Sequence, residues 1–91
     1  MKILVTGFEE FGNVKGNSSL EVLKRLDIKD KIILPVSYKR AKEEIAKSIS
    51  NIKPDFVLCL GQAGKERKIR IEMLGINYTR GSIPDNDGVL F

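Results

Sequence analysis

The sequence has no histidine, no tryptophan and a single cysteine, Cys59, in 91 residues. Because the chain has no imidazole, it lacks the base that most often activates a nucleophile. One thiol excludes an intramolecular disulfide framework, which suits a reducing cytoplasm. The chain also lacks any apolar run approaching the roughly 18–20 residues of a membrane helix, and the apolar start at residues 3–5 is too short for a signal peptide. We therefore expect a cytoplasmic protein without a membrane segment.

The charge is modest and of mixed sign. Sixteen Lys and Arg against twelve Asp and Glu give a formal net charge of +4, and no basic arm or interleaved aromatics accompany it. We expect no nucleic-acid binding, although a weak electrostatic binder of polyanions, with affinity falling steeply in salt, is an alternative. With 42% hydrophobic and 31% charged residues, the composition is that of one globular domain spanning residues 1–91.

Apolar periodicity predicts alternating strands and helices. The pattern gives a helix capped at Ser18 or Ser19 and an amphipathic helix from Ser37 to Ile52, and a parallel α/β unit follows from the alternation. The run at 56–60 is apolar throughout, which predicts a central strand covered on both faces. Alternation at 69–73 predicts one more strand. The predicted elements are strands at 3–5, 31–36, 56–60 and 69–73, and helices at 18–26 and 37–52.

Two loops, after the first and third strands, are expected to meet at the carboxyl edge of the sheet, where open α/β sheets bind ligands. They carry Phe8, Phe11 and Gln62. The aromatics could instead close a small core, and Gln62 could be a turn residue facing water. Cys59 is the only possible thiol nucleophile, but its apolar strand and the lack of histidine predict a buried, inert side chain. Residues 61–64 lack the ending of a phosphate loop, so we expect no nucleotide, no cofactor and no metal.

Four segments, taken in order, carry a family resemblance. They are Thr6-Gly7-Phe8 with Phe11-Gly12, Lys53-Pro54-Asp55 leading to Gly61-Gln62-Ala63-Gly64, Ile71-Glu72 with Ile76-Asn77, and Ile83-Pro84-Asp85-Asn86. Each is weak alone, but the ordered set resembles the amino-terminal half of the pyroglutamyl peptidases, a family of cysteine peptidases. The resemblance implies a three-layer α/β/α fold with a twisted, mixed sheet, here incomplete.

The resemblance also implies a chemistry, namely removal of an amino-terminal pyroglutamyl residue from peptides by a Cys-His-Glu triad. Glu72 matches the acidic member, which orients the imidazole; read without the resemblance, it is a charge on a strand face. The family's cysteine and histidine lie in segments that this sequence does not contain. The residues implied to contact the lactam ring are Phe8, Phe11, Asn17, Gln62 and Ile83.

Several positions depart from the family pattern. Glu10 replaces a proline, Asn13 a glycine and Ser18 a proline, and Ser82 stands where the family carries an arginine, with Arg80 two residues earlier. We expect a chain that does not hydrolyse substrate alone and that pairs with a complementary carboxyl-terminal half or self-associates, since a sheet without its later strands leaves apolar surface uncovered. The alternative is a non-catalytic α/β binding or assembly module derived from the family.

Overall fold

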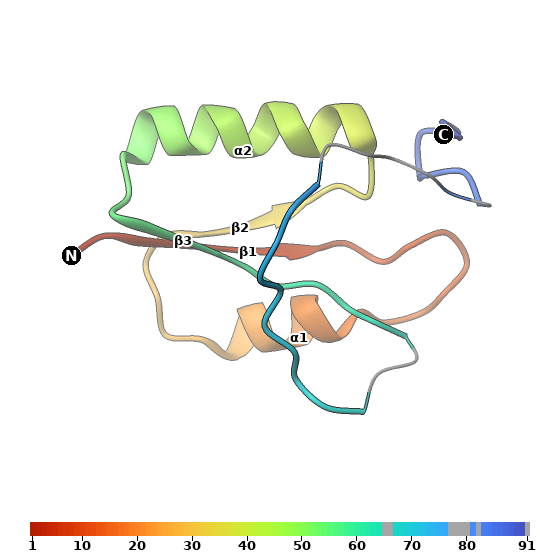
Figure 1. Ribbon diagram of the computed structural model, residues 1–91, viewed down its shortest axis with the longest axis horizontal. Helices are drawn as coiled ribbons and strands as arrows, with labels where there is room; N and C mark the ends of the chain where they lie inside the picture. The colour runs from red at the N-terminus through yellow and green to blue at the C-terminus, as the bar shows by residue number, and fades with distance from the viewer. Residues whose placement is uncertain (65–66, 77–80, 82, 91) are drawn as a thin grey trace.

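A computed structural model describes residues 1–64, 67–76, 81 and 83–90. Strands and helices alternate along it, as the periodicity predicts (Figure 1). The longest helix has 15 residues, and none in the described part is long and apolar enough to cross a membrane. In chain order the elements are β1 (Ile3–Phe8), α1 (Ser18–Arg25), β2 (Lys31–Leu34), α2 (Tyr38–Ile52) and β3 (Phe56–Cys59).

The sheet has the strand order β2-β1-β3, and β1 runs parallel to both neighbours. The two helices lie on opposite faces, with α2 above the sheet and α1 below it in Figure 1. The chain steps in one direction from β1 to β2 and in the other from β2 to β3, so crossovers of one hand must cover opposite faces. The three-layer α/β/α prediction is confirmed, and the described strands are all parallel.

β1, and not β3, is the central strand. Leu4 and Val5 of β1 are fully buried, whereas Phe56 of β3 is 61% exposed and the other β3 residues are exposed too. The prediction of a central strand at 56–60 was therefore wrong, as was that of a buried Cys59, which is exposed. A uniformly apolar run indicates that both faces favour cover, but it does not say whether this chain supplies that cover.

The core lies mainly between β1 and α1. Leu23 of α1 is 2% exposed against the sheet, while α2 buries no residue. A Cβ on Gly7 would lie 3.0 Å from the carbonyl oxygen of Ser19 and 3.3 Å from a methyl of Leu23. Glycine at this position therefore lets α1 lie directly on β1, which fixes the start of α1 beside the carboxyl end of the strand.

The helix ends follow local side-chain chemistry. Asn17, and not Ser18 or Ser19 as predicted, is the N-cap of α1, and its side chain accepts from the Ser19 N–H at 2.9 Å. Ser37 is the N-cap of α2, and its side chain accepts from the Arg40 N–H at 3.0 Å. α2 ends at Lys53, which is left-handed (φ 51°) immediately before a proline.

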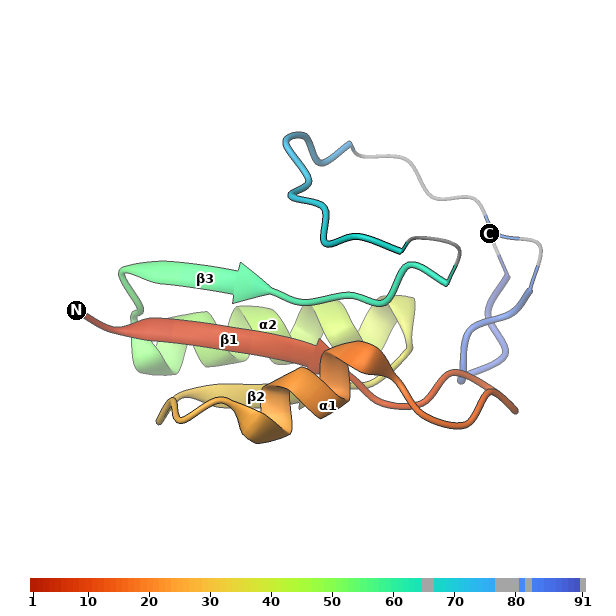
Figure 2. The same cartoon turned by 90° about the horizontal axis from the view of Figure 1, so that it is seen from below.

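Residues 69–73 do not form the predicted strand. Ile69 is 99% exposed, and Ile71 and Met73 are nearly as exposed. Figure 2 shows the segment 67–76 looping away from the sheet, on the side of β3. Alternation creates one apolar face, but a strand also needs a neighbouring edge for its backbone groups, and this segment does not pair with β3.

Candidate functional site

A cavity of about 390 Å³ opens at the carboxyl ends of the strands, where the loops after β1 and β3 come together as predicted. It collects four of the predicted site residues and lies within the size range of small-molecule sites. Its walls combine apolar and polar groups, among them two aromatic side chains and two side-chain amides. The lining residues are Phe8, Phe11, Val14, Gly16, Asn17, Val36, Gly61 and Gln62.

Gln62 joins the loop after β3 to the start of α1. Its Oε1 accepts from the Ser18 N–H at 2.6 Å, one of the donors that a helix start leaves without an intrahelical acceptor. The side chain is thus more than a turn residue facing water. Among the described residues no acceptor bonds the Nε2 of Gln62, so this N–H group can donate to a ligand in the cavity.

Asn17 and Ser19 join the end of β1 to the start of α1 through two consecutive hydrogen bonds. The Phe8 N–H donates to Ser19 Oγ at 3.0 Å, and Ser19 Oγ donates to Asn17 Oδ1 at 2.5 Å. Asn17 is only 9% exposed, and its Nδ2 makes a long 3.4 Å bond to the Glu9 carbonyl. Its oxygen is occupied by the helix cap, so the group that Asn17 can turn toward a ligand is the Nδ2.

The turn 85–89 docks against the first turn of α2, a role that sequence reasoning missed. Asp85 accepts from the Tyr38 N–H at 2.8 Å, and this bond, more than any other contact, lowers the pKa of the Asp85 carboxyl. Asp87 pairs with Arg40 at 2.6 Å, and the guanidinium bond lowers the pKa of Asp87 to about 2. The turn formers of 83–88 were a visible signal, but nothing local indicates which helix they meet.

Asn86, in the same turn, holds the loop between β1 and α1. Its Oδ1 accepts from the Gly12 N–H at 2.8 Å, its Nδ2 donates to the Glu10 carbonyl at 2.9 Å, and its own N–H donates to the Val36 carbonyl at 2.8 Å. Glu9 completes the junction by accepting from the Val36 N–H at 3.0 Å. Three segments distant in sequence are thereby joined beside the cavity.

Two predicted site residues do not line the cavity. Glu72 is exposed on the segment 67–76, and Ile83 is 63% exposed on the approach to the turn 85–89. Arg80 and Ser82, which bear on the family's arginine, lie outside the described residues. The roles assigned to the six predicted site residues stay predictions.

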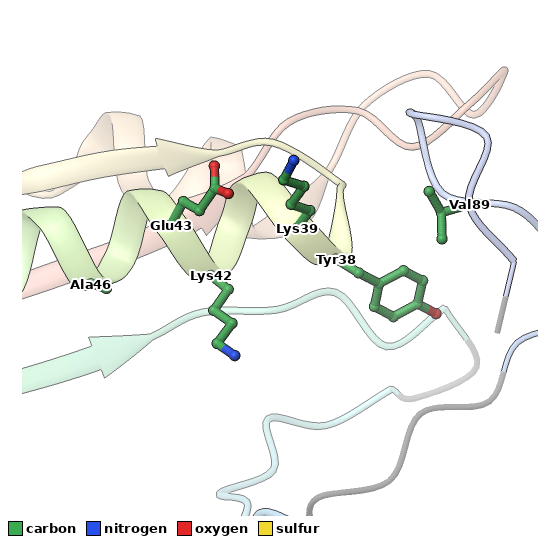
Figure 3. Close-up of a pocket in the computed structure, with 6 residues that line it drawn as sticks. All are labelled: Tyr38, Lys39, Lys42, Glu43, Ala46 and Val89. Carbon is green, nitrogen blue, oxygen red and sulfur yellow. The ribbon is translucent and has the colours of Figure 1, made fainter.

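A second cavity of about 560 Å³ runs along α2 and contains none of the predicted site residues (Figure 3). It is lined by Tyr38, Lys39, Lys42, Glu43, Ala46 and Val89. The figure shows the Tyr38 ring extending from the start of α2 toward the segment that carries Val89. Within the described part of the chain, no group of three or more His, Cys, Asp and Glu could hold a metal ion.

Comparison with known proteins agrees with the sequence and the fold. The family model for pyroglutamyl peptidase matches residues 1–91. Pyrrolidone-carboxylate peptidases from Lactobacillus johnsonii and Fusobacterium nucleatum are 42% and 45% identical, over 97% and 96% of this chain and 44% of each relative. These matches and the ordered motifs define an α/β chain of peptidase-family type. The chain belongs to the pyroglutamyl peptidase family.

Solved structures show the same relation. A mutant pyrrolidone carboxyl peptidase from Pyrococcus furiosus superimposes with a TM-score of 0.91 at 40% identity, over 100% of this chain and 47% of that chain. The enzyme from Fervidobacterium islandicum gives 0.92 at 40% identity, over 98% and 46%. The chain thus spans about half the length of the relatives it matches.

Proposed function

We propose that this chain supplies the lactam-binding part of a pyroglutamyl peptidase and that hydrolysis requires a second polypeptide segment carrying the cysteine and the histidine. The observation that supports this most is the convergence of Phe8, Phe11, Asn17 and Gln62 around one cavity in a chain of this family. The curated relatives are named pyrrolidone-carboxylate peptidases, and this name supports a five-membered cyclic amide as the proposed substrate group.

The chemistry of the cavity suits such a ring. A lactam is flat and neutral, so its faces pack on the aromatic rings of Phe8 and Phe11, while its edge offers one carbonyl acceptor and one N–H donor. The amide nitrogens of Gln62 and Asn17 are the donors for the lactam carbonyl. Discrimination against an open-chain residue is then expected, because no side chain that lines the cavity is charged and could pair with an α-amino group.

In this proposal the groups that carry out the covalent step come from the second segment and not from this chain. The sequence contains no histidine, and its one thiol, Cys59, lies in β3 rather than in the cavity lining. Glu72 is assigned the orienting carboxylate through the resemblance, and it acts only once a histidine is supplied. Without thiolate and base, no acyl-enzyme forms, so this chain alone is proposed to be inactive.

The surface for the second segment is the exposed side of β3. Phe56 and Leu58 are more than half exposed on a strand that is one of the two edges of the described parallel sheet. An open edge with apolar side chains favours the addition of another strand. The same surface favours self-association when the second segment is absent. Sedimentation is therefore expected to show concentration-dependent oligomers, which dissociate when the second segment is added.

The test is reconstitution. The 91-residue chain and the carboxyl-terminal portion of a matched relative are purified separately, mixed, and assayed with a fluorogenic pyroglutamyl amide. We expect no turnover from either part, thiol-dependent turnover from the mixture, and loss of that turnover when Phe11 is replaced by Ala. Leu90→Ala, an exposed apolar change outside the cavity lining, is the matched control and should keep the activity. Turnover by the chain alone would contradict the proposal.

A further inference from the structure

The carboxamide of Asn86 bonds to the backbone on both sides of Phe11. Its Nδ2 donates to the carbonyl of Glu10, the residue before Phe11, at 2.9 Å, and its Oδ1 accepts from the N–H of Gly12, the residue after it, at 2.8 Å. A residue paired to a parallel strand makes the same two bonds, donating to one carbonyl and accepting from the N–H two residues later. The side chain therefore acts as a one-residue strand partner for Phe11.

Apart from those to Asn86, the bonds near Phe11 lie within the loop or at its beginning, and Phe11 itself accepts from the Val14 N–H of the same loop at 3.0 Å. Glu9 fixes the beginning of the loop, because its N–H donates to the Leu34 carbonyl at 3.0 Å. At the end of the loop, Gly16 N–H donates to the Glu10 carboxylate, a bond within the loop itself. Gly12 is left-handed (φ 55°), a conformation that costs a glycine little but that does not hold the backbone in place.

Asn86 is in turn held rigidly. Its backbone N–H donates to the Val36 carbonyl, and its neighbours Asp85 and Asp87 bind the Tyr38 N–H and the Arg40 guanidinium at the start of α2. Its amide has one favourable orientation, since a reversed amide would set oxygen against the Glu10 carbonyl and against the Glu9 carboxylate, which lies 3.2 Å from Nδ2.

We propose that Asn86 is a positioning residue for the cavity, holding Phe11 in the place where its ring meets a lactam. This inference rests on the proposed function for the identity of the ligand, but not for the position of the loop. Without Asn86 the backbone around Phe11 has no partner from outside the loop, so the ring samples several positions and binding must first select one of them. We expect weaker lactam binding with an intact fold.

The experiment compares Asn86→Ala with Asn13→Ala in the full 91-residue chain. Asn13 is an exposed asparagine of the same loop, and its side chain has no bond to any described residue. Two quantities are measured by NMR, the hydrogen exchange of the Gly12 amide relative to the Asn13 amide, and the affinity for L-pyroglutamamide. Methyl signals of Leu4 and Val5 report whether the core is intact.

In the unsubstituted chain the Gly12 amide should exchange at least about tenfold more slowly than the Asn13 amide. In N86A this difference should disappear and the affinity should fall about fivefold or more, while N13A keeps the pyroglutamamide affinity and the slow Gly12 exchange. Fast Gly12 exchange in the unsubstituted chain, which needs no variant to fold, would overturn the inference, as would equal affinities of N86A and N13A. If the unsubstituted chain binds no pyroglutamamide, the proposed function fails, and the exchange comparison alone decides whether Asn86 positions the loop.

Discussion

Replacing Ser19 with Ala tests how the end of β1 is joined to α1. Ser19 is 3% exposed, and its hydroxyl both accepts from the Phe8 N–H at 3.0 Å and donates to Asn17 Oδ1 at 2.5 Å. The substitution leaves the Phe8 N–H without its acceptor and removes one of two bonds to Asn17. A lost bond with an unsatisfied partly buried donor costs about 1–3 kcal/mol, and the better helix propensity of Ala returns roughly 0.5 kcal/mol. We therefore expect the free energy of unfolding to fall by about 1–2 kcal/mol.

Urea unfolding followed by far-UV circular dichroism measures this change, because the sequence has no tryptophan for fluorescence. The free energy of unfolding of a chain of this size falls by about 1 kcal/mol per molar urea, so the urea midpoint should drop by about 1–2 M. Ser50→Ala is the matched control, since Ser50 is exposed in α2. The urea midpoint of this variant should stay unchanged or rise slightly. A Ser19→Ala midpoint within about 0.3 M of that control would refute the reasoning.

Three further predictions concern other parts of the molecule. Thr6 is fully buried and its hydroxyl has no partner among the described residues, so Thr6→Val should leave stability unchanged or raise it by up to about 1 kcal/mol in urea unfolding; a clear loss would show that the hydroxyl is bonded. The Cβ of Gly7→Ala meets backbone at 3.0 Å, so we expect a loss of about 1–3 kcal/mol, and an unchanged midpoint would mean that α1 can shift. Arg40 lowers the pKa of Asp87 to about 2 from 3.8, so this pair stabilises the fold above about pH 4 and the benefit is lost as pH falls toward 2. In Arg40→Gln the free energy of unfolding should therefore fall less between about pH 4 and about pH 2 than in the unsubstituted chain, and added salt should reduce this difference between the two proteins. The same fall in both proteins would refute the assignment.

Local patterns predicted the elements well, because each depends on neighbours in the sequence. The stripe around Leu23 and the stop after Ile52 are both consequences of residues within one or two turns. The alternation of strands and helices likewise predicts a parallel α/β unit, although the placement of the two helices on opposite faces also depends on the strand order. The elements themselves needed no knowledge of distant contacts.

Strand order and exposure depended on what the rest of the chain provides. Residues 56–60 have the composition of a doubly covered strand, yet β3 is an edge strand, because β1 lies between the other two strands, and Cys59 is exposed. The alternation at 69–73 likewise predicted a strand that needs an edge to pair with. Composition indicates which surfaces favour burial, but the identity of the covering element is a tertiary property.

The candidate site divides in the same way. Phe8 ends β1, and Phe11 and Gln62 lie in the loops after β1 and β3, so topology alone predicts that they meet. Asn86 could not be found in this manner, because its role depends on a turn 74 residues away from Gly12 docking on α2. The sequence showed a turn at 83–88 without showing its destination.

The most direct test of the account locates a bound lactam on the chain. Isotope-labelled protein is titrated with L-pyroglutamamide, and intermolecular NOEs from the ring protons are recorded. Saturable NOEs to the rings of Phe8 and Phe11, together with a shift of the Gln62 side-chain amide, are the predicted result. Saturable contacts confined to the cavity at Tyr38, or no saturable contact at millimolar ligand, would contradict the claim that this chain carries the lactam site.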